Sequence, residues 1–161
     1  MDQDFDQFLL LIGRLNYAWT NTESLLIHLI AGLSKTDPDT ATVIFLTLNT
    51  SRARIDLVQR LAKRPRVSNA ERDGILAVTA QLQKASRLRN KYNHCIYAFD
   101  DKSEISHTIL MRIADRKHSI RLGQADAVDE AAISGIHQTI ADLQGTNQDI
   151  WSLIRAYNYP A

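Results

Sequence analysis

The chain has 161 residues, of which 45% are hydrophobic and 23% are charged, a composition typical of one soluble domain with a continuous apolar core. Its 19 basic and 18 acidic residues nearly balance, so no global electric field would attract nucleic acid or a membrane. Any contact with a polyanion must come from a local site. The single cysteine, Cys95, excludes an internal disulfide framework and a cysteine-rich zinc site.

The N-terminal stretch MDQDFDQ is acidic and has no basic flank before an apolar run, and no window holds 18 uninterrupted apolar residues. We therefore expect neither a signal peptide nor a membrane span. The single cysteine agrees with a reducing compartment, so we expect a cytoplasmic protein.

Apolar residues that recur every three or four positions predict four amphipathic helices. These helices are expected at about residues 4–33, 38–63, 68–94 and 126–157. Three of them start at recognisable capping patterns. Asp37 precedes Pro38, Ser68 precedes Glu71 by three positions, and Asp126 can cap the last helix.

Two polar residues, Asn16 and Glu23, stand between Leu9 and Ile30 in a row along the first predicted helix. A carboxylate that leans inward needs a partner. Both side chains are either solvated or bonded within the bundle, or they face a polar cluster on the third helix.

That polar cluster is the sequence RNKYNH, Arg89–His94, at the end of the third predicted helix. Arg89 occupies an otherwise apolar stripe, and its charge must find acceptors in the bundle, in a partner subunit or on a ligand. Arg89 and Asn93 are four residues apart, as are Asn90 and His94, so the two pairs lie along adjacent ridges of one helix end. The polar groups therefore converge on one patch.

Residues 95–122 follow a period of two, which predicts a β-hairpin between the third and fourth helices. Its expected strands are Ile105–Ile113 and His118–Leu122, and Ile96–Phe99 is a candidate third strand. His107 and His118 would face each other and, with His94, would bring three histidines together. Their spacing matches no established ligand pattern, so no metal and no cofactor are expected.

The predicted fold is mainly α. Four helices would form an up-and-down bundle, with the β-hairpin inserted at about residues 95–122. The whole chain, residues 1–161, would be a single domain.

The motif in this setting resembles the RNxxxH form of the active-site motif of the HEPN superfamily (higher eukaryotes and prokaryotes nucleotide-binding domains). Many such proteins are metal-independent endoribonucleases of toxin–antitoxin and antiviral systems, and they act as dimers that bring two motifs together. The resemblance thus implies a homodimer that cleaves RNA, with an antitoxin or a nucleotidyltransferase as a candidate partner. Other members have lost catalysis and serve as binding or dimerisation modules. The hairpin insertion is not part of the family's minimal bundle.

RNA cleavage without a metal needs a group that moves the 2′-hydroxyl proton, a group that protonates the leaving oxygen, and a cation that stabilises the phosphorane. His94 is the candidate general acid or base, because histidine titrates near neutrality. Arg89 is the candidate phosphate clamp, and Asn90 would orient these groups or the substrate. One motif supplies one histidine, so an acid and a base together would require a second subunit.

Three further residues are candidates for supporting roles. Glu23 is a candidate partner of Arg89, and Tyr92 and Asn93 are candidates for substrate contact. The competing hypothesis is a non-catalytic helical module, in which Arg89 and His94 bond across a homodimer interface or hold a nucleotide. The near-neutral net charge slightly favours this module. An enzyme predicts that both side chains line an open cleft between subunits, whereas a structural module predicts that they are sealed.

Overall fold

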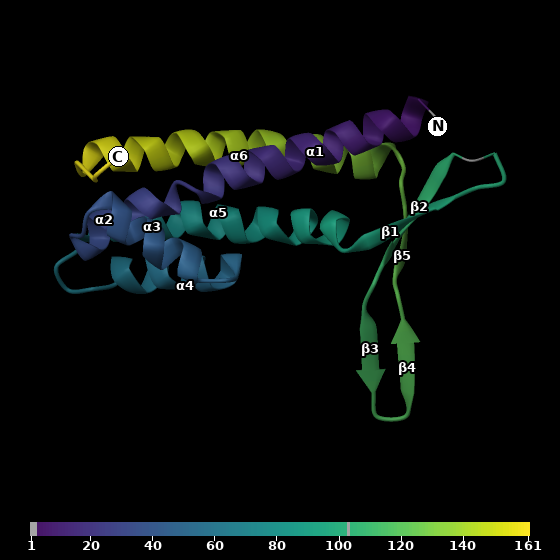
Figure 1. Ribbon diagram of the computed structural model, residues 1–161, viewed down its shortest axis with the longest axis horizontal. Coiled ribbons are helices and arrows are strands. Elements are labelled where there is room, and N and C mark those ends of the chain that lie inside the picture. Colours follow the sequence, from purple (N-terminus) through teal and green to yellow (C-terminus); the bar gives the residue numbers. More distant parts are fainter. Residues whose placement is uncertain (1–2, 103) are drawn as a thin grey trace. The chain divides into compact units, whose positions relative to one another are not determined.

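The computed structural model describes residues 3–102 and 104–161. Within these ranges the chain is mainly helical and forms six helices and five short strands (Figure 1). The helices are α1 (Gln3–Glu23), α2 (Leu26–Ser34), α3 (Pro38–Thr47), α4 (Ser51–Ala62), α5 (Asn69–Asn93) and α6 (Glu130–Ala156). The strands are β1 (Cys95–Phe99), β2 (Ile105–Leu110), β3 (Ile113–Arg116), β4 (Ser119–Leu122) and β5 (Ala125–Ala127). The mainly helical fold is confirmed, but the prediction of four unbroken helices with one hairpin is wrong.

The described residues divide into two compact units. The motif unit contains the residues up to Tyr17 together with Arg87–Ile140, and the helical unit contains Ala18–Ser86 and Ala141–Ala161. The helices α1, α5 and α6 each contribute residues to both units. That the chain forms a single domain stays a prediction.

The first expected helix is broken after Glu23. The Leu25 N–H donates to the Thr22 carbonyl at 3.2 Å, an i→i+3 bond in place of the helical i→i+4 bond. The Ser24 hydroxyl donates to the Asn21 carbonyl at 3.0 Å and supports this tight turn. The apolar stripe resumes on α2 at the buried Leu26, which is why the periodicity did not reveal the break.

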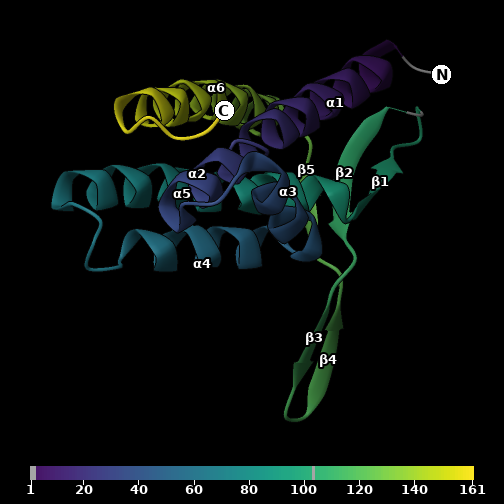
Figure 2. The same cartoon turned by 60° about the vertical axis from the view of Figure 1, so that its left-hand side comes forward.

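The second expected helix is also two helices. Asp37 caps α3 as predicted, because its carboxylate accepts a hydrogen bond from the Thr40 N–H at 2.8 Å. The helix ends at Thr47, and a second cap starts α4, where the Thr50 hydroxyl accepts from the Ala53 N–H at 3.1 Å. The two short helices α3 and α4 both contact α2 (Figure 2).

The third expected helix is a single one, α5. The Ser68 hydroxyl accepts from the Glu71 N–H at 3.2 Å, which confirms Ser68 as the N-cap. The Glu71 carboxylate accepts a hydrogen bond from the Tyr159 hydroxyl. The core of the helical unit includes the fully buried Trp19, Leu26, Ile30, Ile55, Ile75, Leu82 and Ile150.

The segment between α5 and α6 holds two antiparallel sheets rather than one hairpin. Strand β2 lies between β1 and β5, and β3 pairs with β4 in a separate ribbon (Figure 1). The expected strand Ile105–Ile113 is therefore split, because its first part pairs with β1 and β5 whereas Ile113 pairs with Leu122. His107 lies opposite Ala98 and Ala127, and His118 lies in the β3–β4 turn, so the expected pairing of these two histidines is wrong.

The cap of α6 is Asp129 rather than Asp126. The Asp129 carboxylate accepts from the Ala132 N–H at 2.8 Å. Asp126 lies in β5 and forms an ion pair with Lys91, with 3.0 Å between Nζ and Oδ2. Asp126 was misassigned because β5 extends the β-segment beyond residue 122.

No helix among residues 3–102 and 104–161 has the length and the apolarity needed to cross a membrane.

Candidate active site at the end of α5

The motif residues lie on the last turn of α5 and at its exit. Arg89, Asn90 and Asn93 belong to the helix, and His94 follows its last residue. The His94 N–H donates to the Asn90 carbonyl at 3.2 Å, so the backbone of His94 still follows the helix although the residue lies outside it. Strand β1 starts directly afterwards at Cys95.

A pair of asparagines, Asn16 on α1 and Asn93 on α5, anchors this helix end inside the motif unit. Their side-chain amides form two reciprocal hydrogen bonds, with Nδ2 to Oδ1 distances of 3.0 and 2.9 Å. The Asn16 Nδ2 also donates to the Ile12 carbonyl at 3.1 Å. We call Asn16 and Asn93 the amide clamp. It joins α1 to the last turn of α5.

Arg89 is half-buried, and its guanidinium bonds to the amide clamp and to its neighbour. Its Nε donates to Asn16 Oδ1 at 3.3 Å, and a terminal NH donates to Asn90 Oδ1 at 3.1 Å. The two amide oxygens thus hold the guanidinium at the end of α5.

The side chain of His94 is exposed, whereas its backbone is held from both sides. Its N–H bonds to α5, and its carbonyl accepts a hydrogen bond from the Met111 N–H at 3.2 Å. The backbone of His94 is therefore fixed while its imidazole stays accessible to solvent. Whether His94 and Arg89 line an open cleft between subunits or are sealed at an interface stays a prediction.

A buried aromatic layer supports the helix end. Tyr92 is 3% exposed and packs edge-on against Phe8, with ring centroids 5.9 Å apart. The Tyr97 ring also packs against Phe8, at 5.8 Å, and its hydroxyl donates to the Tyr92 carbonyl at 3.1 Å. This bond satisfies one of the carbonyl groups that a helix C-terminus leaves unpaired. Tyr92 therefore has a supporting position, and its buried ring offers no surface to a large substrate.

Burial removes the nearby phenols and the thiol from proton chemistry at neutral pH. Burial raises the pKa of Tyr97 to about 12 and also raises the pKa of Tyr92. It likewise raises the pKa of the Cys95 thiol, whose sulfur donates to the Tyr92 carbonyl at 3.4 Å. All three groups stay protonated near pH 7, so neither a phenolate base nor a thiolate nucleophile is available from them.

Glu23 belongs to the helical unit, where its carboxylate has its own partners. Arg54 lies 3.3 Å from Oε2, and the Trp19 Nε1 donates to the same oxygen at 3.2 Å. The half-buried guanidinium of Arg54 also donates to the carbonyls of Phe45 and Leu48. The candidate pairing of Glu23 with Arg89 stays a prediction.

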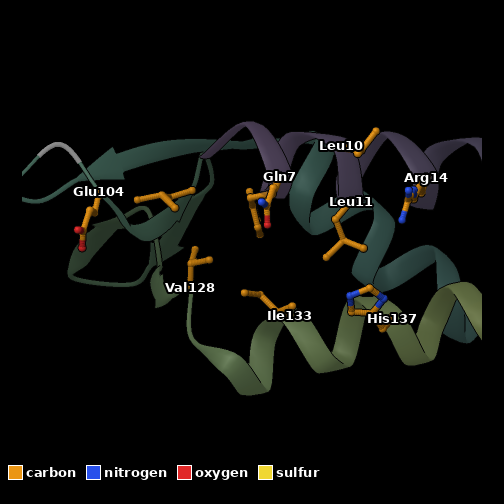
Figure 3. Close-up of a pocket in the computed structure, with 10 residues that line it drawn as sticks. Gln7, Leu10, Leu11, Arg14, Glu104, Val128, Ile133 and His137 are labelled. Carbon is orange, nitrogen blue, oxygen red and sulfur yellow. The ribbon is translucent and has the colours of Figure 1, made fainter. Parts of the chain in front are cut away.

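A cavity of about 510 Å³ lies elsewhere in the motif unit, between α1, β2 and the start of α6 (Figure 3). Leu11 and Ile133 are part of its apolar wall, Arg14 and His137 lie toward one end, and Glu104 lies at the other. The lining residues do not include Arg89 or His94. This volume is typical of small-ligand pockets, and no residue of the Arg89–His94 motif lines it.

Among the described residues, no group of three or more His, Cys, Asp or Glu side chains is placed to hold a metal ion. His94, His107 and His118 therefore do not form the three-histidine cluster that the alternating sequence pattern suggested. The chemistry that this surface supports is that of Arg89, Asn90 and His94, in a setting fixed by the amide clamp.

The sequence indicated the convergence of Arg89, Asn90, Asn93 and His94, since all four lie on one helix end. For Asn16 the sequence left two alternatives open, a solvated or bundle-bonded side chain or one that faces this cluster, and the structure shows that Asn16 bonds to Asn93 and Arg89 of the cluster. In comparisons with protein-family models, curated proteins and solved structures, none matched this chain.

Proposed function

We propose that the protein is a metal-independent endoribonuclease whose active site is formed by Arg89, Asn90 and His94. The observation that supports this best is the contrast at the motif. A half-buried arginine is held in place by two asparagine side chains, while a histidine five residues later is exposed on a fixed backbone. The resemblance of the motif to RNxxxH adds to this support.

In the proposed reaction the 2′-hydroxyl of one nucleotide attacks the adjacent phosphorus, and the bond from phosphorus to the 5′-oxygen of the next nucleotide breaks. The products carry a 2′,3′-cyclic phosphate and a 5′-hydroxyl. His94 takes the 2′-hydroxyl proton as a neutral base, or gives a proton to the leaving 5′-oxygen as an imidazolium. Arg89 stabilises the negative charge of the phosphorane, and Asn90 holds the guanidinium toward it.

A single copy supplies one histidine of the motif, whereas the reaction needs both a base and an acid. We therefore propose a homodimer in which two motifs face each other. A toxin–antitoxin or antiviral setting, with an antitoxin or a nucleotidyltransferase as partner, belongs to the same proposal and is supported by the resemblance alone.

The test is cleavage of mixed tRNA and mRNA by the purified protein in excess chelator. Arg89→Ala and His94→Ala should each abolish cleavage while the far-UV circular dichroism stays helical. His137→Ala is the matched control, because His137 is an exposed histidine of the same unit that lies outside the motif. Cleavage by His94→Ala at the wild-type rate would show that the site is assigned wrongly.

A second candidate is a non-catalytic module that dimerises or holds a nucleotide through the same residues. The observation in its favour is that two nitrogens of the Arg89 guanidinium bond to side-chain amides of the motif unit. Such bonds also occur where an arginine has only a structural role and its hydrogen bonds satisfy buried polar groups. Absence of cleavage, with a dimer measured by light scattering, would support this module.

A further inference from the structure

The β3–β4 ribbon is the most exposed part of the motif unit. Every residue from 111 to 122 is exposed, and we call this segment the β3–β4 arm. It continues from the three-stranded sheet through hydrogen bonds between the Leu110 N–H and the Gln124 carbonyl and between the Gly123 N–H and the Arg112 carbonyl, both 2.9 Å (Figure 1). The arm is thus an ordered ribbon with two open faces.

The register places three arginines in a row on one face of the arm. Ala114 lies opposite Arg121, Arg116 lies opposite Ser119, and Arg112 bonds to Gly123 one step earlier in the same register. Directly opposed residues of an antiparallel pair point to the same side, and so do alternate residues along a strand. Each of three successive levels on this face therefore carries one arginine, opposite a glycine, an alanine or a serine.

Consecutive levels lie two residues apart along the strand, which corresponds to about 6.8 Å. The arginine row therefore extends over about 14 Å. The small residues opposite leave the guanidinium groups uncovered. The only acidic residue of the arm, Asp115, lies on the other face, opposite Ile120. No side chain among the described residues forms an ion pair with Arg112, Arg116 or Arg121.

The arm is one of two strongly basic segments of the chain; the other is residues 52–66 of the helical unit, where five arginines and Lys63 stand with one acid, Asp56. Three arginines and Lys117, with Asp115, give residues 111–122 a net charge of +3, whereas the whole chain carries +1. The remainder is therefore slightly acidic. Within the motif unit, a row of arginines without an acidic partner among the described residues is a local site for a polyanion.

The arm is also connected directly to the motif. The Met111 N–H donates to the His94 carbonyl at 3.2 Å, and the arginine row begins at the next residue, Arg112. The arginine row therefore begins one residue after a backbone hydrogen bond to the motif.

We propose that the β3–β4 arm binds the phosphate backbone of RNA through Arg112, Arg116 and Arg121. The arginine face carries no aromatic side chain on which unpaired bases could stack, so the contacts are made to phosphates and are independent of base sequence. The naming of RNA as the polyanion rests on the proposed function, but binding is measured separately from cleavage.

The experiment measures the affinity of full-length His94→Ala protein for a short fluorescein-labelled RNA stem-loop by anisotropy over a series of salt concentrations. In that background, Arg112→Gln, Arg116→Gln and Arg121→Gln are combined. Loss of three phosphate contacts should weaken binding by at least about tenfold at low salt and should reduce the slope of log K against log salt by about 2–3.

The matched control removes the same charge from exposed positions elsewhere, by combining Lys84→Gln, Lys102→Gln and Arg155→Gln. It should leave the salt slope nearly unchanged. Replacing the three arm arginines with lysines keeps the charge and should retain most of the affinity, which distinguishes a phosphate contact from a folding defect.

The other face of the arm carries the exposed Met111, Ile113, Ile120 and Leu122, so a protein could dock on the arm instead. If the arginine triple variant binds RNA like its parent, while Ile120→Ser with Leu122→Ser changes the oligomeric state, the arm is a protein contact and our proposal is wrong. If wild type cleaves RNA but the arginine triple variant binds RNA with unchanged affinity, the RNA-binding role of the arm is wrong and the proposed function still stands. Arm-dependent binding without any cleavage would refute the proposed function and leave the arm as an RNA-binding site.

Discussion

Replacing Asn16 with alanine tests the amide clamp, because this one side chain takes part in four hydrogen bonds. It donates to Asn93 and to the Ile12 carbonyl, and it accepts from Asn93 and from the Arg89 Nε. A neutral hydrogen bond contributes about 1 kcal/mol, and one to a charged group contributes about 1.5–3 kcal/mol. Asn93 is exposed and Arg89 is half-buried, so water can replace part of what is lost. We therefore expect a total loss of only about 1–2 kcal/mol.

The assay is urea unfolding. With a slope near 2 kcal/mol per molar, Asn16→Ala should lower the midpoint by about 0.5–1 M. Asn21→Ala on the same helix is the control, because its side chain is exposed and belongs to the helical unit, and it should stay within about 0.5 kcal/mol of wild type. An unchanged midpoint in Asn16→Ala would refute the clamp as a stabilising element.

The aspartate variant separates stability from function at the same position. Asn16→Asp keeps an acceptor for Arg89 and Asn93, so its unfolding midpoint should lie between those of Asn16→Ala and wild type. Its added negative charge next to the phosphate clamp should nevertheless reduce RNA cleavage more than Asn16→Ala does. Equal cleavage by the two variants would contradict the role of Arg89 as a phosphate clamp.

Three further predictions concern stability. Burial raises the pKa of Tyr97 in the folded protein to about 12. The protonated phenol therefore stabilises the fold fully below about pH 10, and this stabilisation is lost as the pH rises toward 12. Tyr97→Phe should lose less thermal stability than wild type over this alkaline range. The pKa of Asp126 is lowered by its lysine partner, so Asp126→Asn should cost less than about 1 kcal/mol at pH 7, and this difference should disappear as acid protonates the wild-type carboxyl. A Cβ at Gly32 would overlap the Tyr159 ring, so Gly32→Ala should destabilise by about 1–3 kcal/mol in urea. Gly145→Ala has nothing within 4 Å of the new Cβ and should stabilise α6 by about 0.5–1 kcal/mol; a reversed order of the two glycine variants would contradict this packing.

Local signals in the sequence identified much of the secondary structure. Asp37 and Ser68 were predicted as caps, and both accept the expected backbone hydrogen bonds. The breaks after Glu23 and Thr47 were missed for one physical reason. Neither break is marked by glycine or proline, and the apolar residues keep their helical spacing across each break. The periodicity of the whole segment therefore predicts one continuous helix.

Strand pairing could not be read from alternation alone. A period of two indicated that residues 105–113 were extended, but it contains no information about which strand lies alongside. The chain changes partners at Met111 and Arg112, from β1 and β5 to β4, and that change depends on segments distant in sequence. Asp126 was assigned to a helix cap for the same reason, since its pairing with Lys91 is not local.

In the candidate site, too, local sequence signals were informative and tertiary contacts were not predictable. The spacing within one helix placed Arg89, Asn90 and Asn93 together, because residues three or four apart share a face. The contact of Asn16 with Asn93 joins positions 77 residues apart, and no local pattern determines it. The link from His94 to the β3–β4 arm is likewise a tertiary hydrogen bond, which the sequence did not indicate.

The most direct test of the central claim compares one RNA with the same sequence that carries a 2′-deoxy nucleotide at the mapped cleavage site, both incubated in excess chelator with wild type and with His94→Ala. We predict that wild type cleaves only the all-ribose RNA, leaves 2′,3′-cyclic phosphate and 5′-hydroxyl ends, and loses this activity in His94→Ala. Cleavage of the deoxy-substituted RNA at that site, or cleavage that persists in His94→Ala, would contradict a metal-independent ribonuclease centred on Arg89 and His94.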